Sequence, residues 1–416
     1  MTFTALHRAV GAEPGPLTED LLDQAVRAGV EETTDLDWKT RLPDSSKLRD
    51  SDFFKDAAAM ANAGGGVIVF GVTESEKAAN GRADAGEFSE NYERTLRAVA
   101  MRAITPPVFG LKIHQFGREP RRAVVVEVPA SIDGPHLIFN NQFFGAPVRD
   151  DADTTWMDER RLEAMYRARF DERRKATEVT DRLYDESARG RDTAHRAWLV
   201  AVAHPRRPLS HLAVDREHAI TAFNDALAMG KQYTEQDGIH PLESVERHNL
   251  RPGLRRWVAR YTATEKRERW KESWATLHHD GSVTLATSVG GHPFAASETH
   301  PGSHIEAQGM ECGVADFMAL VRATAQLTGN GDYDLRVGVE WDGNEPLTIL
   351  THDGFGFTAE FSTPIHGFTP VEVSVDAEGP DSAFIASVYA LAQDCVNQGG
   401  ISNLQMIVKP PGDMET

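Results

Sequence analysis

Three acidic residues, Glu32, Asp37 and Glu74, are of a type that binds hard metal ions, and their spacing allows them to meet if the elements that carry them are neighbours. Asp37 is predicted to project from a strand over residues 34–39, because apolar and polar residues alternate there. Glu74 follows the wholly apolar run 67–70, which is typical of a buried central strand. If these two strands are neighbours, the carboxylates of Asp37 and Glu74 meet at one end of a sheet, and Glu32 lies just before the first strand.

Carboxylate oxygens are hard ligands for Mg²⁺ or Mn²⁺, and such a cation can activate water and neutralise charge that develops on a phosphodiester. The spacing leaves alternatives open. Acids at strand ends are also common as solvated side chains, and Asp35 shares a face with Asp37 and is a substitute ligand. A regular strand would place Glu32 and Asp37 on opposite faces, so they converge only if the chain bends between them, at Thr33–Thr34.

The glycine triplet 64–66 does not form a phosphate-binding loop. A P-loop runs from a strand through glycines and a lysine into a helix, whereas here a predicted helix precedes the glycines and a strand follows them. A dinucleotide-binding fingerprint fails for the same reason. We expect no ATP binding through a P-loop, and we expect these glycines to adopt positive φ angles and approach another backbone closely.

The elements that must position the acids form an α+β pattern over residues 1–157. Thr18, Ser51 and Ser89 are each predicted to cap a helix with an apolar face. Further strands are predicted at 111–116 and 123–128. The sequence therefore predicts a mixed sheet with helices, in a first domain that ends near residue 157.

A long connecting helix is predicted over residues 158–192, because its apolar stripe is narrow and charged residues fill the rest. A second α+β domain follows over residues 193–416. Its predicted strands lie at 198–202, 283–286, 335–341 and 347–350, and its predicted helices lie at 215–229, 314–328 and 382–397. This second domain resembles no family that we can name, so its role stays open.

The distribution of charge restricts where a nucleic acid could bind. The net charge of the chain is -19, and a chain this acidic repels phosphate on average. Residues 1–157 contribute -7, residues 158–192 contribute 0 and residues 193–416 contribute -12. The second domain is therefore a poor candidate for binding a phosphate backbone. On the first domain, which is also acidic, nucleic acid could bind only at a local patch of positive charge or with the help of a bound metal ion.

Residues 32–39 resemble the Schlafen AlbA pattern of a glutamate, four residues, a glutamate, an aromatic residue and a lysine. Residues 59–74, AMANAGGGVIVFGVTE, look like the AFANTxGGxLxxGVxD segment of that family. Pro135–His136 and Val148–Arg149 are similar to its closing stretch. The resemblance covers roughly residues 15–165, and its middle segment is the most specific part.

In nuclease members of this family, three acids form a metal-assisted site that cuts structured RNA such as tRNA. The resemblance assigns that role, and the Mg²⁺ or Mn²⁺ ligands, to Glu32, Asp37 and Glu74. Asp37 stands where the family has glutamate and Glu74 where it has aspartate, so the charges are kept but each carboxylate moves by one methylene. Lys39, Arg41 and Arg149 are the candidate nucleic-acid-binding residues, and we expect RNA in preference to DNA as the ligand.

Three function classes remain open at this point. The first is a divalent-metal-dependent endoribonuclease, the second a DNA- or RNA-binding regulator that does not cleave, and the third a protein-interaction or sensor module driven by the acidic second domain. Schlafen proteins with two lobes pair them around the substrate, so a homodimer of this chain could rebuild that clamp. Two cysteines without a CxxC pair, no apolar run that could span a bilayer and no signal segment lead us to expect a cytoplasmic protein away from membranes.

Overall fold

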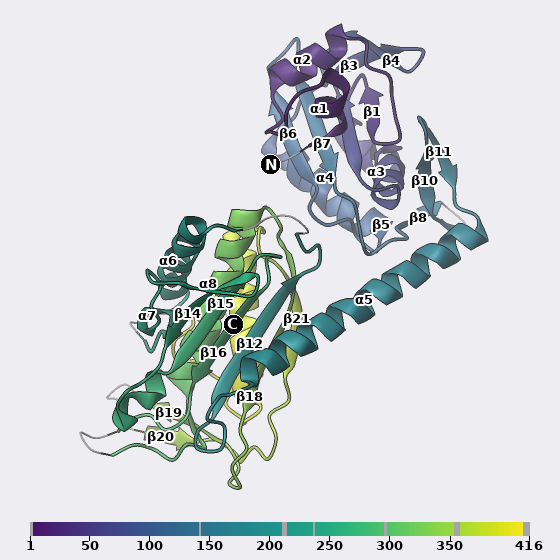
Figure 1. Ribbon diagram of the computed structural model, residues 1–416. Helices are drawn as coiled ribbons and strands as arrows, with labels where there is room; N and C mark the ends of the chain where they lie inside the picture. Colours follow the sequence, from purple (N-terminus) through teal and green to yellow (C-terminus); the bar gives the residue numbers. More distant parts are fainter. Residues whose placement is uncertain are drawn as a thin grey trace. The chain divides into compact units, whose positions relative to one another are not determined.

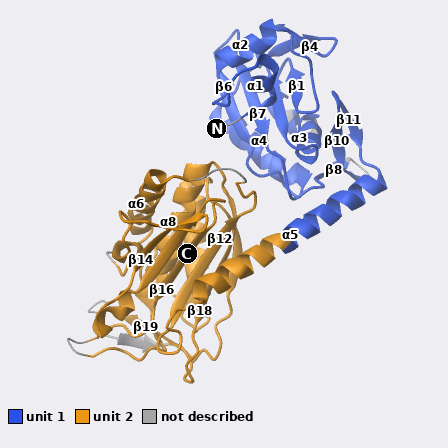
Figure 2. Ribbon diagram, viewed as in Figure 1, with its two compact units in different colours: residues 1–174 blue, residues 175–416 orange. Residues whose placement is uncertain are grey.

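A computed structural model describes residues 3–140, 143–209, 214–235, 238–294, 298–352 and 358–410. The chain divides into two compact units, residues 1–174 and 175–416 (Figure 2). The division lies inside helix α5 (Glu159–Ala188), whereas the sequence placed the domain boundaries at residues 157 and 193. Both units mix helices and strands, which confirms the predicted α+β class.

The core of unit 1 is a four-stranded mixed sheet in the order β1-β2-β7-β6. Its strands are β1 (Leu36–Lys39), β2 (Gly66–Phe70), β6 (Lys112–Phe116) and β7 (Ala123–Val128). β1 is an edge strand and runs parallel to β2, with Asp37 in register with Ile68. β1, which carries Asp37, and β2, which precedes Glu74, are therefore neighbouring strands, as the predicted metal site requires.

Helices cover both faces of this sheet (Figure 1). They are α1 (Ala5–Val10), α2 (Glu19–Arg27), α3 (Phe53–Asn62) and α4 (Glu90–Ala103). Alternate residues of β2 point to opposite faces: Ile68 packs in the core formed with α3 and α4, and Val67 packs in the core formed with α1 and α2. Asp37, in register with Ile68, therefore faces the layer that contains α3.

Local sequence signals account for most of these boundaries. The side chains of Thr18 and Ser89 accept hydrogen bonds from the third residue on, as helix caps do. Ser51 was predicted to cap α3, and this is wrong: its hydroxyl donates to the carbonyl of Leu48 and the helix begins at Phe53. Gly65 has a φ of 91°, and a Cβ atom there would lie 2.6 Å from the backbone nitrogen of Ala130, which confirms the close approach expected of the glycines.

Two short hairpins and a small sheet complete unit 1. β3 (Val72–Ser75) pairs with β4 (Ala78–Arg82), and β10 (Pro147–Asp150) pairs with β11 (Asp153–Trp156). The small sheet contains β5 (Ile104–Thr105), β8 (Leu137–Asn140) and β9 (Phe143–Gly145), and a 3-10 helix, η1, spans Ser45–Asp50. The sequence did not predict either hairpin, although both carry residues of the site described below.

Unit 2 is built on a seven-stranded antiparallel sheet in the order β13-β14-β15-β16-β12-β18-β21. Its strands are β12 (Trp198–Pro205), β13 (Arg251–Gly253), β14 (Arg256–Tyr261), β15 (Ser273–His278), β16 (Val283–Ser288), β18 (Asp332–Glu340) and β21 (Val371–Asp376). A smaller sheet contains β17 (His304–Glu306), β19 (Thr348–His352) and β20 (Thr358–Phe361). The helices are α6 (Arg216–Gln232), α7 (Pro241–Ser244), α8 (Ala307–Thr328) and α9 (Asp381–Asn397), with a 3-10 helix, η2, at Lys266–Lys271.

The two faces of the large sheet in unit 2 have different coverings. Leu199 and Ala201 of β12 pack in the core that contains α6, α8 and α9. Trp198 and Val200 point the other way and pack against Leu183, in the C-terminal half of α5. All four strands and three helices predicted for this half of the sequence are confirmed. Among the described residues, no helix combines the length and the apolar character that a bilayer crossing needs.

Candidate functional site

A tight turn before β1 brings Glu32 and Asp37 together. Thr33 and Leu36 exchange two backbone hydrogen bonds, of 3.1 and 3.3 Å, so the chain reverses through the two residues between them. The reversed chain places a carboxylate oxygen of Glu32 at 3.0 Å from the backbone nitrogen of Trp38, which donates a hydrogen bond to it. The bend that the sequence required at Thr33–Thr34 is therefore present.

Glu74 reaches the same place from the β3–β4 hairpin. Gly71 lets the chain turn out of β2 with a φ of 95°, and β3 then carries Glu74 with a bulge just before it. The backbone nitrogen of Glu32 donates a 2.7 Å hydrogen bond to the carbonyl oxygen of Lys77 in this hairpin. The side chains of Glu32 and Glu74 are close enough to share a hydrogen bond.

This arrangement raises the pKa of Glu32 to about 7. The largest cause is burial, which penalises the charged carboxylate. The negative charges of Asp37 and Glu74, and the hydrogen bond that protonated Glu32 donates to the carboxylate of Glu74, raise the pKa further, while the hydrogen bond from the backbone of Trp38 opposes them. Glu32 therefore holds or releases a proton near neutral pH, in a position where two other acids lie nearby.

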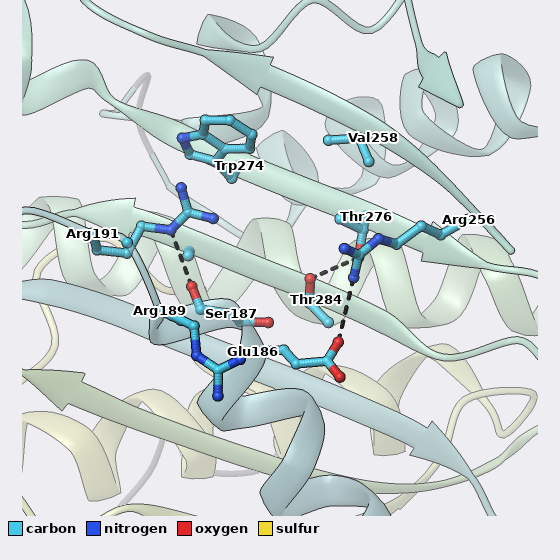
Figure 3. Close-up of a pocket in the computed structure, with 11 residues that line it drawn as sticks. Glu186, Ser187, Arg189, Arg191, Arg256, Val258, Trp274, Thr276 and Thr284 are labelled. Atoms are coloured by element: carbon cyan, nitrogen blue, oxygen red, sulfur yellow. Dashed lines mark hydrogen bonds and ion pairs between the residues drawn. The ribbon is translucent and has the colours of Figure 1, made fainter. Parts of the chain in front are cut away.

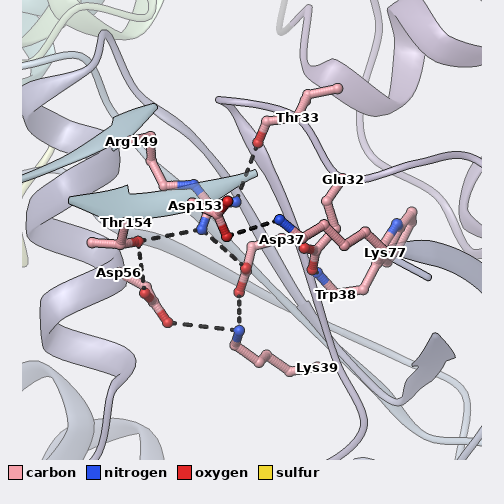
Figure 4. A network of polar contacts seen from close by, with 10 residues as sticks. All are labelled: Glu32, Thr33, Asp37, Trp38, Lys39, Asp56, Lys77, Arg149, Asp153 and Thr154. Carbon is pink, nitrogen blue, oxygen red and sulfur yellow. Dashed lines mark hydrogen bonds and ion pairs between the residues drawn. The ribbon is translucent and has the colours of Figure 1, made fainter. Parts of the chain in front are cut away.

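Asp37 is held by two cations and is almost completely buried, with 2% of its side chain exposed. The ammonium of Lys39 lies 2.7 Å from one carboxylate oxygen, and the guanidinium of Arg149 lies 3.2 Å from the other (Figure 4). Arg149 comes from β10 and also donates to the carbonyl oxygen of Thr33, at 3.3 Å. It thereby connects the β10–β11 hairpin to both the turn and the edge strand.

Asp56 of α3 is a fourth acid at this site, and the sequence analysis missed it. Its carboxylate lies 3.7 Å from Lys39 and accepts a 3.3 Å hydrogen bond from the hydroxyl of Thr154 (Figure 4). Burial raises the pKa of Asp56, the charge of Asp37 raises it further, and Lys39 and Arg149 act in the opposite direction. The available signal was a carboxylate inside an otherwise apolar helix face, next to Ala57.

We call these six residues, Glu32, Asp37, Lys39, Asp56, Glu74 and Arg149, the acid network. Lys39 has 38% of its side chain exposed, so it is the cation of the network that solvent reaches. Burial by itself lowers the pKa of Lys39, but the charge and hydrogen bond of Asp37, followed by the charges of Asp56 and Glu32, raise it overall. Arg41 is exposed just beyond β1, and Arg149 is buried, with 4% exposed.

Asp35, the substitute ligand that the sequence left open, lies outside this network. Its carboxylate forms an ion pair with Arg8 and accepts a 2.8 Å hydrogen bond from the hydroxyl of Thr33. The turn itself separates Asp35 from Asp37, because Asp35 sits at the tip and Asp37 lies inside the strand. Of the acids that the sequence singled out, Glu32, Asp37 and Glu74 therefore belong to the acid network and Asp35 does not.

The first part of the chain, residues 32–158, matches the domain family described as Schlafen, AlbA_2. It is a Schlafen AlbA-type domain. The match starts at Glu32 and includes both hairpins, so all six residues of the acid network lie within the AlbA-type domain. Domains of this family are associated with nucleic-acid binding. The matched segment, residues 32–158, makes up less than a third of the chain.

No curated protein matches this chain in sequence. Among solved structures, it is similar to the DIP2311 protein from Corynebacterium diphtheriae, with 12% identity and a TM-score of 0.24. That comparison covers 51% of this chain and 37% of that protein, so the chain spans little more than a third of that protein's length. A similarity this weak carries no argument about fold or function.

The acid network of the AlbA-type domain fits a divalent cation in part. Glu32 and Glu74 offer carboxylate oxygens from two segments, and a cation could replace the proton between them. Asp37 fits less well, because each of its oxygens faces a cationic side chain. Within the described ranges, no three Asp, Glu, His or Cys side chains already form a group that could hold a metal ion.

Proposed function

We propose that the AlbA-type domain binds RNA beside the acid network and hydrolyses a phosphodiester bond with a Mg²⁺ or Mn²⁺ ion held by Glu32 and Glu74. The observation that supports this is the pair of carboxyl groups of Glu32 and Glu74, with the pKa of Glu32 raised to about 7. Perturbed carboxylates in contact with one another are common at catalytic sites. The proton that this pair retains near neutral pH occupies the place in which a cation would be most strongly attracted.

The residues of the chain have separate roles in this proposal. A bound divalent cation supplies positive charge that polarises the phosphodiester. Glu32 and Glu74 bind that cation, and the backbone of Trp38 orients Glu32. Lys39, held by Asp37 and still exposed to solvent, is placed to contact a phosphate oxygen. Asp37 is therefore a positioning residue for Lys39, rather than the third metal ligand that the resemblance assigned.

The binding of the RNA backbone falls to exposed cations around the network. Lys39 and Arg41 are the predicted contacts with accessible side chains. Arg149 was predicted to contact nucleic acid as well, but we propose a different role for it. Its guanidinium is buried and bonded to Asp37 and Thr33, so it holds the turn and β1 in place.

A second candidate function is nucleic-acid binding without cleavage. Two observations favour it: both oxygens of Asp37 are engaged by cations, and the described residues contain no ready three-ligand metal group. In that case the role of the acids is structural: they hold Lys39 and the turn in place. The exposed cations then bind phosphate groups, and no bond is cleaved. Such binding would weaken as the salt concentration rises, because it depends on the release of counterions.

Incubating the full-length protein with tRNA, in Mn²⁺ or in EDTA, tests the proposal. We expect cleavage in Mn²⁺ that EDTA abolishes, and a loss of about 100-fold or more in Glu32→Gln and Glu74→Gln. Glu31→Gln is the matched control, because Glu31 is an exposed neighbour with the same charge and is not among the charges that act on Glu32. This control should cleave at the wild-type rate.

The other outcomes distinguish the alternatives. Salt-sensitive binding of tRNA without cleavage, weakened in Lys39→Ala and Arg41→Ala and unchanged in Glu74→Gln, would establish the second candidate. Equal cleavage by wild type and Glu74→Gln would end the metal-site proposal, because the activity would then come from elsewhere. If neither tRNA nor duplex DNA bound at low salt, the protein-interaction class would be the one that remains.

A further inference from the structure

Unit 2 contains a cavity of about 360 Å³ whose lining combines arginine and hydroxyl side chains with the apolar surface of Trp274, Val258 and Ala286 (Figure 3). It lies between the C-terminal end of α5 and the strands β14, β15 and β16, on the face of the large sheet opposite α6 and α8. Its volume is within the range of about 300–1,000 Å³ that is usual for small-ligand sites. Nothing assigned above to the AlbA-type domain involves this cavity.

Arg191 is fixed in one orientation beside this cavity. Its Nε donates a 3.0 Å hydrogen bond to the carbonyl oxygen of Ser187, and its guanidinium lies 4.4 Å from the ring centre of Trp274 and 5.7 Å from that of Trp198. No carboxylate forms an ion pair with it in the described part of the chain. Burial lowers the pKa of Arg191 to about 10, with the charge of Glu272 opposing the shift, so the side chain is still charged at neutral pH.

Two more arginines line the same cavity. Arg256, from β14, has a distant ion pair with Glu186, at 3.6 Å, and its buried Nε has no hydrogen-bond partner among the described residues. Arg189 is exposed at the end of α5, next to Gly190, whose φ of 79° ends the helix. The helix end and the sheet therefore place three arginines in the lining of the cavity, and the guanidinium groups of Arg191 and Arg256 extend toward it from opposite sides (Figure 3).

The charge of this cavity is opposite to that of its surroundings. Three arginines and a single acid, Glu186, line it, so its formal charge is +2, whereas unit 2, with 21 Lys and Arg and 34 Asp and Glu over residues 175–416, carries -13. The hydroxyls of Thr276 and Thr284 form part of the wall and are hydrogen-bonded to each other at 2.7 Å. Concentrated positive charge inside an acidic domain, with Arg191 lacking an ion-pair partner among the described residues, is the arrangement expected for an anion-binding site.

We propose that this cavity binds a small phosphate monoester, with its phosphate on Arg191 and Arg256 and its organic group in the rest of the cavity. A phosphate monoester carries a charge of about -1.5 to -2 at neutral pH, which balances the charge of the lining. Guanidinium groups match phosphate oxygens in pairs, which a lysine does not. The space is larger than a phosphate ion needs and is of the size that holds a mononucleotide or a sugar phosphate. Unit 2 is thus a binding module for a phosphorylated metabolite.

Isothermal titration calorimetry on the full-length protein tests this proposal with four probes: AMP, ribose 5-phosphate, inorganic phosphate and adenosine. We expect at least one of the two monoesters to bind with a dissociation constant below about 1 mM, more tightly than inorganic phosphate, and adenosine not to bind. Arg191→Lys and Arg256→Met should each weaken monoester binding by about tenfold or more, the usual cost of losing one charge-assisted hydrogen bond.

Arg216→Met is the matched control, because Arg216 is an exposed arginine on α6, on the other face of the sheet. It should bind the monoesters as the wild type does, and circular dichroism of each variant excludes unfolding as the cause of a loss. The proposal is overturned if neither monoester binds up to about 10 mM, or if Arg216→Met weakens binding as much as Arg191→Lys. Displacement of a bound monoester by tRNA would also overturn it, because the cavity would then hold a nucleic-acid backbone.

Discussion

Glu32 is the residue whose protonation couples the acid network to the stability of unit 1. In the unfolded chain its carboxyl group titrates near 4.5, and in the folded protein burial and the charges of Asp37 and Glu74 raise the pKa to about 7. Between these values the folded state keeps a proton that the unfolded state has lost. The free energy of unfolding therefore falls as the pH rises from about 4.5 to about 7, and this contribution is constant above that.

Glu32→Gln should remove this dependence. Because glutamine cannot ionise and can still accept the hydrogen bond from Trp38, we expect the variant to be more stable than the wild type at pH 7.5, by on the order of 2 kcal/mol after allowance for partial exposure. At pH 4.5 the two should be similar. Urea unfolding in EDTA at the two pH values measures this, with Glu31→Gln as the control. A variant less stable than the wild type at pH 7.5 would contradict the raised pKa.

At the scale of elements, Arg149 connects the β10–β11 hairpin to the edge strand β1. Asp37 and Arg149 are 2% and 3% exposed at their side chains, so removing one of them leaves the other's charge buried. Arg149→Met should lower the free energy of unfolding of unit 1 by about 3 kcal/mol, as expected for breaking a buried ion pair. Lys39→Met should cost less, because Lys39 is 38% exposed and solvent can compensate for part of the lost charge.

A double-mutant cycle separates this coupling from simple loss of packing. If the ion pair is the cause, Asp37→Asn combined with Arg149→Met should destabilise the protein by less than the sum of the two single changes. Urea unfolding of the four proteins at pH 7.5 gives the coupling energy. Additive effects would mean that Arg149 stabilises the hairpin through its other contacts, with Thr33 and Thr154.

The sequence predicted the long elements of both units because their apolar residues recur with a clear period. The hairpins β3–β4 and β10–β11 escaped prediction, since β4 (AANGR) and β11 (DTTW) are short and have no alternation of apolar residues. Contacts made by these two hairpins determine the positions of several side chains in the acid network. Asp56 and Thr154 are 98 residues apart, and Asp37 and Arg149 are 112 apart, so no local pattern could reveal that they meet. Motif positions found Glu32, Asp37 and Glu74, but only the packing shows that Asp37 is engaged by two cations.

At the scale of the whole molecule, each unit has its own hydrophobic core. The cores of unit 1 are formed by residues up to Met165, and those of unit 2 by residues from Val179 onward. The connection is α5, whose residues between these limits are mostly exposed. No core cluster among the described residues draws on both units, so the free energy that stabilises one unit does not depend on the packing inside the other.

Differential scanning calorimetry of the full chain should therefore show two transitions that variants shift one at a time. Phe317→Ala, in the fully buried centre of α8, should destabilise unit 2 by about 3–5 kcal/mol and lower one transition, because it leaves a cavity in the core. Arg149→Met should lower only the other transition, since the changes are in separate cores and their effects should be independent. A single transition that both variants lower would mean that the two units unfold as one cooperative body.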